Sequence, residues 1–329
     1  MRTTGIVGAA IVLAANVASA QSITAEADAT AGISTENVRS GSTQARLFGA
    51  SASDWRFLTE LSVGGTAGHQ SDAFSAAYPY DRRVRAMELF VEKTFHHGNS
   101  IGGFRAGRYR TPFGIYTRGE YGYSGFARPP LIRYGREFAL SNTSLEAGVN
   151  LIAGIPQLYG EASFGAPSDE GALHRRNGLD TTLRVQGYYK GLVAGMSRLH
   201  SGHNRELDAF AHGDQKFTGF DARWMFDGVQ LRGEWIYGAA FTGVGTKGGY
   251  IDLSVHRPAF GIITPVARAE RLDYDAGRFS FRDRRFTGGA RIHVLQWLTA
   301  QLNVIHQPSG MSVGRVTVVD AGVTVSLRR

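Results

Sequence analysis

The chain has 329 residues with 43 glycines, 11% aromatic residues, no cysteine and a formal net charge of +8 at pH 7. Without cysteine, a disulfide framework and thiol catalysis are excluded, and 43% hydrophobic residues in regular alternation do not fit a disordered protein. No apolar run approaches the roughly 18 residues that a helical membrane span needs, so spanning helices are excluded as well.

The N-terminus predicts a cleaved secretion signal over residues 1–20. Arg2 supplies the positive charge, residues 5–17 form an apolar core, and small residues ending at Ala20 make a cleavage site. The apolar core is too short to span a bilayer as a helix. We therefore expect an exported chain whose mature part, 21–329, keeps 35 basic and 28 acidic residues.

The mature part alternates between apolar and polar side chains along its length. Near its start, Ile23 and Ile33 share one face while Glu26 lies on the other, the period of two that β-strands show. An Asp-Gly turn at 227–228 joins two such segments into a hairpin. The predicted strands are 22–34, 44–51, 54–65, 84–95, 100–110, 144–154, 158–165, 179–189, 191–200, 216–226, 229–239, 249–257, 264–274, 284–294, 298–306 and 314–327.

The predicted connections alternate in length. Short turns on one side and long loops on the other are typical of outer-membrane barrels, and an even strand count places both termini on the periplasmic side. The short turns are at 52–53, 96–99, 155–157, 227–228 and 295–297, and the long loops are at 66–83, 111–143, 166–178, 201–215 and 275–283.

These features predict an all-β fold, a transmembrane antiparallel β-barrel of about 16 strands in the bacterial outer membrane, with the long third outer loop folded inward. Residues 1–20 would be the signal peptide and 21–329 a single barrel domain. Barrels of about 16 strands leave an aqueous lumen. The outward residues expected to contact lipid include Leu183, Val185, Trp224, Leu231, Val323 and Val325.

The third loop, with the end of the strand before it, has a concentrated positive charge. Between Arg105 and Arg136 there are seven arginines and one acid, Glu120, which gives this stretch a net charge of +6. Its aromatic rings and prolines make it too apolar and stiff to extend into solvent, so we expect it to fold into the barrel mouth. Arginine stays charged and offers a planar fork of donors to anions. The predicted constriction residues are Arg108, Arg110, Arg118, Arg128, Arg133, Arg136, Tyr116 and Tyr121.

Two other interpretations of the third loop stay open. Its arginines could bind phosphates of lipopolysaccharide, or the loop could be packed without a role in selectivity. The charges predicted on the inner face of the barrel wall do not distinguish these interpretations. Opposite charges two residues apart, such as Asp221 and Arg223, could line an open pore or fill a closed one. The predicted wall residues are Arg184, Arg223, Arg232, Glu234, Arg268 and Glu270.

Three segments resemble a known family. The sequence Gly-Arg-Tyr-Arg-Thr-Pro-Phe-Gly at 107–114 resembles a motif of the phosphate-selective porins and their relatives, and 266–273 and 286–307 are similar to late strands of that family. The resemblance implies a sixteen-stranded porin, often trimeric, whose third loop narrows the channel, with Arg108, Arg110 and Arg118 at or near the constriction by position. The chain departs from the family in two ways. It has only four lysines, whereas the phosphate-selective members use lysines as well as arginines, and it ends at Arg329 instead of at an aromatic residue.

The predicted function is a porin-type passive diffusion channel for small hydrophilic solutes, with a preference for anions and without catalysis, metal or cofactor. The expected partners are outer-membrane lipid and lipopolysaccharide, small hydrophilic or anionic solutes, and further copies in a homotrimer. No nucleic acid is expected, because the basic excess is confined to one loop.

The alternative functions are a structural or adhesion barrel with a plugged lumen and an outer-membrane hydrolase, for which Asp252 and His256 are the inner-face candidates. A Gly-x-Gly-x-x-Gly match at 243–248 lies in an expected outer loop and lacks the helix that a dinucleotide site requires.

Overall fold

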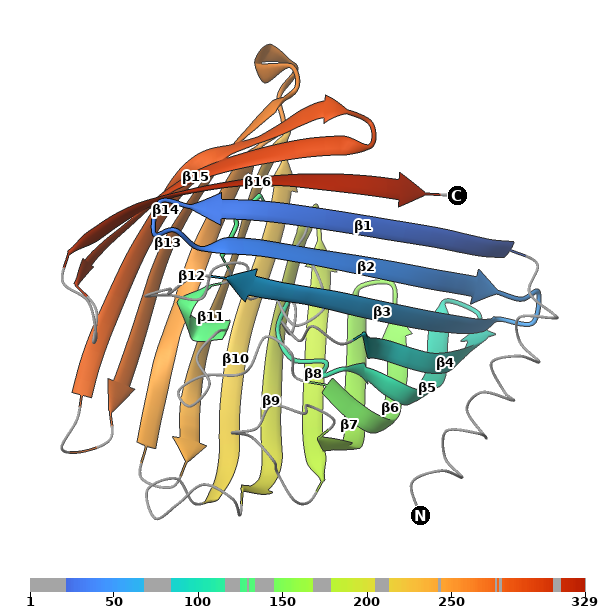
Figure 1. Ribbon diagram of the computed structural model, residues 1–329. Helices are drawn as coiled ribbons and strands as arrows, with labels where there is room; N and C mark the ends of the chain where they lie inside the picture. The colour runs from blue at the N-terminus through green and yellow to red at the C-terminus, as the bar shows by residue number, and fades with distance from the viewer. Residues whose placement is uncertain are drawn as a thin grey trace.

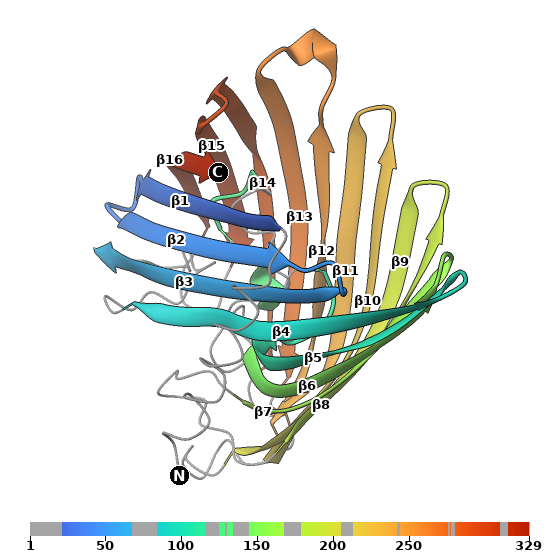
Figure 2. The ribbon, with the colours of Figure 1, turned by 90° about the vertical axis from the view of Figure 1, so that its right-hand side faces the viewer.

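The computed structural model describes residues 22–67, 84–115, 125–128, 130–133, 145–167, 179–204, 213–241, 244–275, 277, 280–309 and 315–328. The strands pair antiparallel in chain order, and the first pairs with the last, which closes the barrel. Figures 1 and 2 show that the first strand begins where the last one ends. We call this end of the barrel the terminal end and the opposite end the loop end.

The barrel contains sixteen strands, as the alternation predicts. They are β1 (Ser22–Ser34), β2 (Arg39–Ala50), β3 (Trp55–Ala67), β4 (Arg85–His97), β5 (Ser100–Arg110), β6 (Leu145–Ile155), β7 (Leu158–Pro167), β8 (Asp180–Tyr189), β9 (Leu192–Asn204), β10 (Gly213–Phe226), β11 (Val229–Phe241), β12 (Val244–Val255), β13 (Ile263–Asp275), β14 (Ser280–Leu295), β15 (Leu298–Ser309) and β16 (Val316–Arg328). The described residues also include two short 3-10 helices, η2 (Leu131–Arg133) and η3 (Pro258–Phe260). Over the described part of the chain, no helix is long and apolar enough to cross a membrane.

Tight turns at the terminal end set the register of the hairpins. Asp227 and Gly228 have φ angles of 46° and 71°, and Lys190 and Gly191 have φ angles of 42° and 80°. Two consecutive positive φ angles are the mark of a type I′ turn, whose twist matches that of the strands it joins. The β10–β11 and β8–β9 pairings are therefore fixed by their turns as well as by side-chain alternation.

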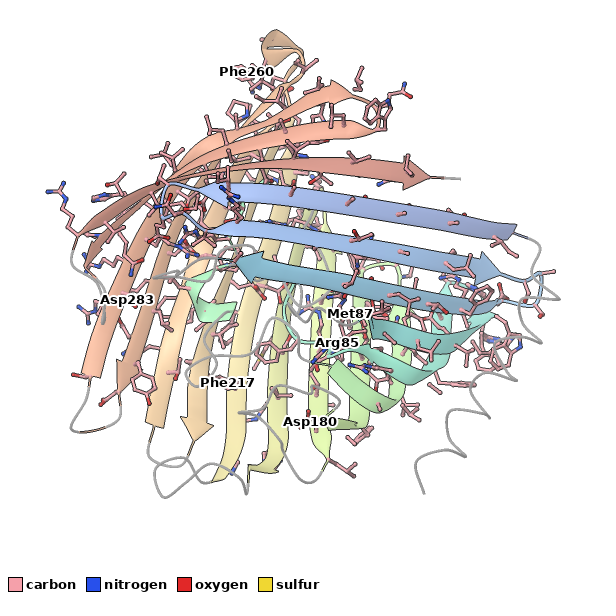
Figure 3. All side chains as sticks on the ribbon, viewed as in Figure 1. Arg85, Met87, Asp180, Phe217, Phe260 and Asp283 are labelled. Carbon is pink, nitrogen blue, oxygen red and sulfur yellow. The ribbon has the colours of Figure 1, made fainter. Side chains whose placement is uncertain are left out.

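The two faces of the barrel wall have opposite polarity (Figure 3). The outer face carries large apolar side chains that are exposed, and the inner face carries buried polar and charged ones such as Arg184 and Asp221. Five of the residues predicted to face lipid are exposed, and Val325 is half-buried. The exposed five are Leu183, Val185, Trp224, Leu231 and Val323.

Four strands begin nearer the loop end than the sequence predicts. β2 begins at Arg39 instead of 44, β10 at Gly213 instead of 216, β12 at Val244 instead of 249, and β14 at Ser280 instead of 284. The expected outer loop at 243–248 is therefore largely strand, and this prediction was wrong. Glycines in this segment carry no side chain, so the alternation that marks a strand is hidden there. Gly248 is needed in the strand, because an added Cβ would lie 2.3 Å from the carbonyl oxygen of Arg271 on β13.

Candidate functional site

The described parts of the third loop lie inside the barrel. They comprise residues 111–115, 125–128 and 130–133, between β5 and β6. Apolar side chains anchor both limbs, since Phe113 and Ile115 on the first limb and Phe126, Leu131 and Ile132 on the second are buried. The second limb ends in η2, which contacts β12 and β13.

The first limb is bound to the wall across the barrel from β5. The amide N–H of Gly114 donates to Ser197 Oγ at 3.1 Å, and that of Ile115 donates to Glu234 Oε1 at 2.8 Å. The Phe113 ring occupies the space above Gly219, where an added Cβ would lie 2.8 Å from the ring. A glycine at 219 thus lets the loop approach the wall closely.

Two hydrogen bonds tie the second limb to the wall. The amide N–H of Ala127 donates to Asn303 Oδ1 at 2.7 Å, and that of Leu131 donates to Glu270 Oε1 at 2.9 Å. Backbone donors that leave water need acceptors, and here inner-wall side chains provide them. These bonds help to stabilise the described parts of the loop inside the barrel.

Arg128 makes the most extensive contact between the loop and the wall. Its guanidinium donates to both carboxylate oxygens of Asp320, from Nε at 2.7 Å and from Nη2 at 3.0 Å, and to Glu36 at 3.0 Å. Arg128 is 3% exposed, and its carbonyl oxygen accepts a hydrogen bond from Arg268 at 2.8 Å. A bidentate pair fixes orientation as well as distance, so Arg128 sets the position of the second limb.

Carboxylates of the wall also bind arginines at the start of the loop. Arg110 is buried and bonded to Glu60, and its Nε lies 3.3 Å from Glu88 Oε2. Arg105, further down β5, donates to Glu92 at 2.7 Å. The positive charge of this stretch is therefore offset in part by acids of β3 and β4.

The inner wall of β8–β14 carries a chain of ion pairs between strands. Asp252 accepts from Arg232 at 2.9 Å and from Arg268 at 2.5 Å, and Arg285 donates to Glu270 at 2.5 Å. The partners of these charges lie on neighbouring strands, whereas the spacing in sequence suggested pairs along one strand.

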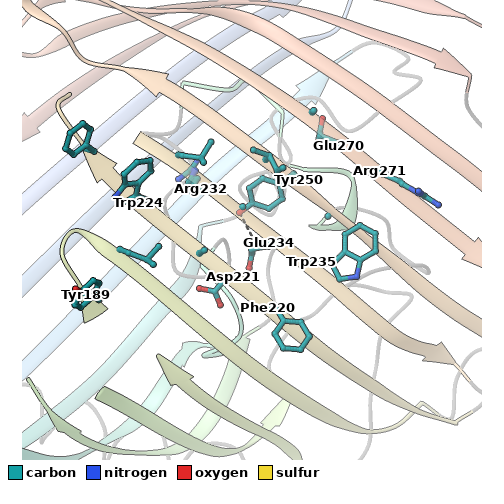
Figure 4. Close-up of a pocket in the computed structure, with 18 of the residues that line it drawn as sticks. Tyr189, Phe220, Asp221, Trp224, Arg232, Glu234, Trp235, Tyr250, Glu270 and Arg271 are labelled. Atoms are coloured by element: carbon teal, nitrogen blue, oxygen red, sulfur yellow. Dashed lines mark hydrogen bonds between the residues drawn. The ribbon is translucent and has the colours of Figure 1, made fainter. Parts of the chain in front are cut away.

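Glu234, on β11, joins the wall to the first limb of the loop. One of its carboxylate oxygens accepts from Tyr250 Oη at 2.8 Å (Figure 4). The other accepts from the loop amide of Ile115. The register of the same hairpin places Arg223 of β10 opposite Arg232 of β11.

Arg184 and Asp221 pair across an intervening strand. Arg184 is on β8 and Asp221 on β10, and they form two hydrogen bonds at 2.6 and 2.9 Å. Between them, on β9, a Cβ on Gly195 would lie 3.0 Å from both side chains. Glycine leaves the room that the pair needs.

The structure describes part of the predicted constriction. Arg110 and Arg128 are buried and paired with wall carboxylates. Arg108 lies opposite Leu89 and Ala147 in the register, on the same face of the sheet as the exposed Val149, so its position in β5 is an outward one. Arg133 belongs to η2. The other four, Arg118, Arg136, Tyr116 and Tyr121, lie outside the described residues.

Sequence reasoning missed the acceptors that hold the loop. Alternation places Asp320, Glu60 and Asn303 on the inner face, but it gives no sign of their loop partners.

The inner-face candidates for hydrolysis, Asp252 and His256, each have other partners. Asp252 is bound by two arginines, and the ring nitrogens of His256 lie 3.2 Å from Ser254 Oγ and 3.4 Å from Thr264 Oγ1. A hydrolase of the serine type needs a carboxylate on the second nitrogen of such a histidine. Within the described ranges, no group of three or more histidine, aspartate or glutamate side chains forms a metal site.

No protein-family model and no curated protein matches the sequence. Among solved structures, Pseudomonas putida OprB superimposes with a TM-score of 0.67 at 10% identity, over 95% of this chain and 96% of that one. Salmonella typhi OmpF in complex with daunomycin gives 0.65 at 12% identity, over 93% and 97%. An anion-selective porin from Comamonas acidovorans gives 0.61 at 11% identity, over 93% and 99%. At these identities the likeness shows the fold: the chain shares its barrel architecture with these proteins over nearly its whole length.

Proposed function

We propose that the protein is a porin-type channel of the bacterial outer membrane that lets small hydrophilic solutes diffuse passively. The observation that carries this proposal is a closed sixteen-stranded barrel with exposed apolar side chains outside and buried polar side chains inside. Apolar side chains on the outside suit a barrel in lipid. Closure suits it too, because an unpaired strand edge is costly in a bilayer. A barrel of this strand number leaves a lumen wider than its own side chains fill.

The inward third loop supports a narrowed channel and also favours a second candidate. Ion pairs such as Arg184–Asp221 and the loop contacts of Arg128 fill part of the interior, which a plugged structural barrel would also need. The two candidates differ in whether water-filled space remains beside the loop. They predict opposite results in a permeability measurement.

Liposome swelling tests the proposal directly. Purified mature barrel in liposomes should admit arabinose and glycine, while a trisaccharide should enter more slowly, because the loop narrows the passage. Planar-bilayer recordings should show stepwise conductance from the same preparation. Liposomes with heat-denatured protein are the control. Absence of both swelling and conductance in a correctly folded preparation would establish the plugged barrel.

We infer an anion preference from the net charge of +6 between Arg105 and Arg136. The Comamonas acidovorans porin, whose barrel resembles this one, is an anion-selective protein. Because Arg105, Arg110 and Arg128 are paired with wall carboxylates, selectivity in this proposal rests mainly on the other arginines of the loop, Arg118, Arg133 and Arg136.

The proposed assembly is a homotrimer that packs through β1 and β2. In the middle of these strands several outward residues are small and directly paired, with Ala27 opposite Ala45 and Ala31 opposite Gly41. A hollow of about 480 Å³, lined in part by Ala27 and Ala45, lies here. Small side chains let a second copy approach closely, and closed symmetry is the rule for such assemblies. Light scattering of the purified barrel in detergent gives the number of copies.

A further inference from the structure

Charged side chains stand on the outer face of β12–β14 near the loop end. They are Lys247, Arg271, Arg282, Arg284 and Asp273, which we call the outer-face basic cluster. The register places Lys247 opposite Asp273 and Asp273 opposite Arg282, with Arg271 opposite Arg284 in the next outward row. Five charged side chains thus occupy two adjoining rows on a face that is otherwise largely apolar.

The cations of the cluster outnumber its acids. Asp273 accepts from Arg271 Nε at 3.0 Å and from Arg282 Nε at 2.8 Å, and Asp275 at the end of β13 adds a second acid on this face. Even so, the Arg271 and Arg282 side chains stay 39% and 56% exposed, and Lys247 and Arg284 are exposed too. Arg271 already binds Asp273 through Nε and Nη2. The exposed side chains of Lys247, Arg282 and Arg284 lie on the same outer face, where an external anion can reach them.

An apolar hollow adjoins the cluster. Its volume is about 1,040 Å³, and its lining includes Arg271 and Trp235 (Figure 4). Ile251 and Phe286, on outward positions, also belong to the lining. The next outward row beyond Arg271 and Arg284 consists of Ile251, Ala269 and Phe286. The hollow forms where the outward residues are small, at Ala269, Gly233 and Gly249. Basic donors therefore stand at one edge of a depression wide enough for hydrocarbon chains.

We propose that the outer-face basic cluster and this hollow bind one phosphorylated lipid of the outer leaflet. The guanidinium forks of Arg271 and Arg284 take the phosphate, since this geometry matches phosphate oxygens, and the acyl chains lie in the hollow. Charge on the lipid face is tolerated near the interfaces of a bilayer and disfavoured at its midplane, which suits a position near the strand ends. The site rests on the proposed placement of the barrel in the membrane.

Native mass spectrometry of the mature barrel in non-ionic detergent tests the site. Diphosphorylated lipid A is the probe, and the same lipid after removal of its phosphates is the comparison. We expect the barrel to hold the phosphorylated form about tenfold more tightly, which corresponds to about 1.4 kcal/mol. Arg271→Gln with Arg284→Gln should abolish that preference. Ala269→Trp, which fills the hollow but keeps the charges, should weaken the binding of both lipids.

A matched control removes the same charge elsewhere. Arg257→Gln with Arg328→Gln replaces two exposed arginines outside the cluster and should leave lipid binding unchanged. Resistance of each variant to SDS before heating reports folding, and conductance reports the channel, which the cluster variant should retain. Equal binding of the two lipids, or equal loss in the control, overturns the proposal. A change of oligomeric state in the cluster variant would also overturn it, by identifying a second copy as the occupant.

Discussion

At the scale of single residues, neighbours along one strand face opposite surroundings. Leu231 is 40% exposed on the outer face, and Arg232 is 7% exposed on the inner face, where it pairs with Asp252. Leu231→Arg would place a charge in lipid, at a cost of about 2–4 kcal/mol near the midplane and less toward the interfaces. We expect this change to lower the yield of folded barrel in a heat-modifiability assay, with Leu231→Ala as the size control.

The adjacent substitution should be milder. Arg232→Leu removes one cation from Asp252, but Arg268 still donates to the same carboxylate at 2.5 and 2.9 Å, so no charge is left buried and unpaired. If Arg232→Leu impaired assembly as strongly as Leu231→Arg, the assignment of inner and outer faces would be wrong at this strand.

At the scale of elements, the described parts of the third loop are held to the barrel wall by a few hydrogen bonds and ion pairs. Arg128→Gln removes the cation from Asp320 and Glu36, and breaking a buried pair on one side costs about 3–5 kcal/mol. Strand pairing does not depend on this contact, so we expect the barrel to form and the second limb to loosen. Single-channel recordings should then show larger and noisier conductance than the unmodified protein.

A second substitution separates the ion pair from general damage. Asp320→Asn in the Arg128→Gln background removes the carboxylate that was left without its partner, so stability to denaturant should recover in part. A double variant no more stable than Arg128→Gln alone would show that the cost comes from lost packing instead of from an uncompensated charge.

The sequence predicted the strands far better than the contacts of the loop. Alternation reports which face each side chain takes, and turns such as Asp227-Gly228 fix the register, so sixteen strands could be counted. Starts of strands were missed where glycines such as Gly245, Gly248 and Gly249 remove the pattern. The pairing of Arg128 with Asp320, 192 positions along the chain, depends on barrel closure and has no local signal.

At the scale of the whole molecule, charge on the loop is balanced by charge on the wall. The formal net charge of +8 suggests a basic interior, yet Asp320, Glu60 and Glu92 each bind an arginine from the stretch 105–136. The composition of the loop therefore overstates the positive field inside the barrel. In the proposed channel, selectivity would depend on arginines of the loop outside these pairs.

The last prediction concerns two arginines of the loop that lie outside the described residues. Arg118→Gln with Arg136→Gln should move the reversal potential in a KCl gradient toward the non-selective value, because a few charges act strongly in a narrow passage of low dielectric constant. The effect should fade at 1 M salt, where the Debye length is about 3 Å. Arg257→Gln is the control, because Arg257 lies at an exposed turn of the terminal end. This substitution should leave the reversal potential unchanged. An anion preference that survives the double substitution would assign these arginines to surface lipid or to packing, and the selectivity to another part of the wall.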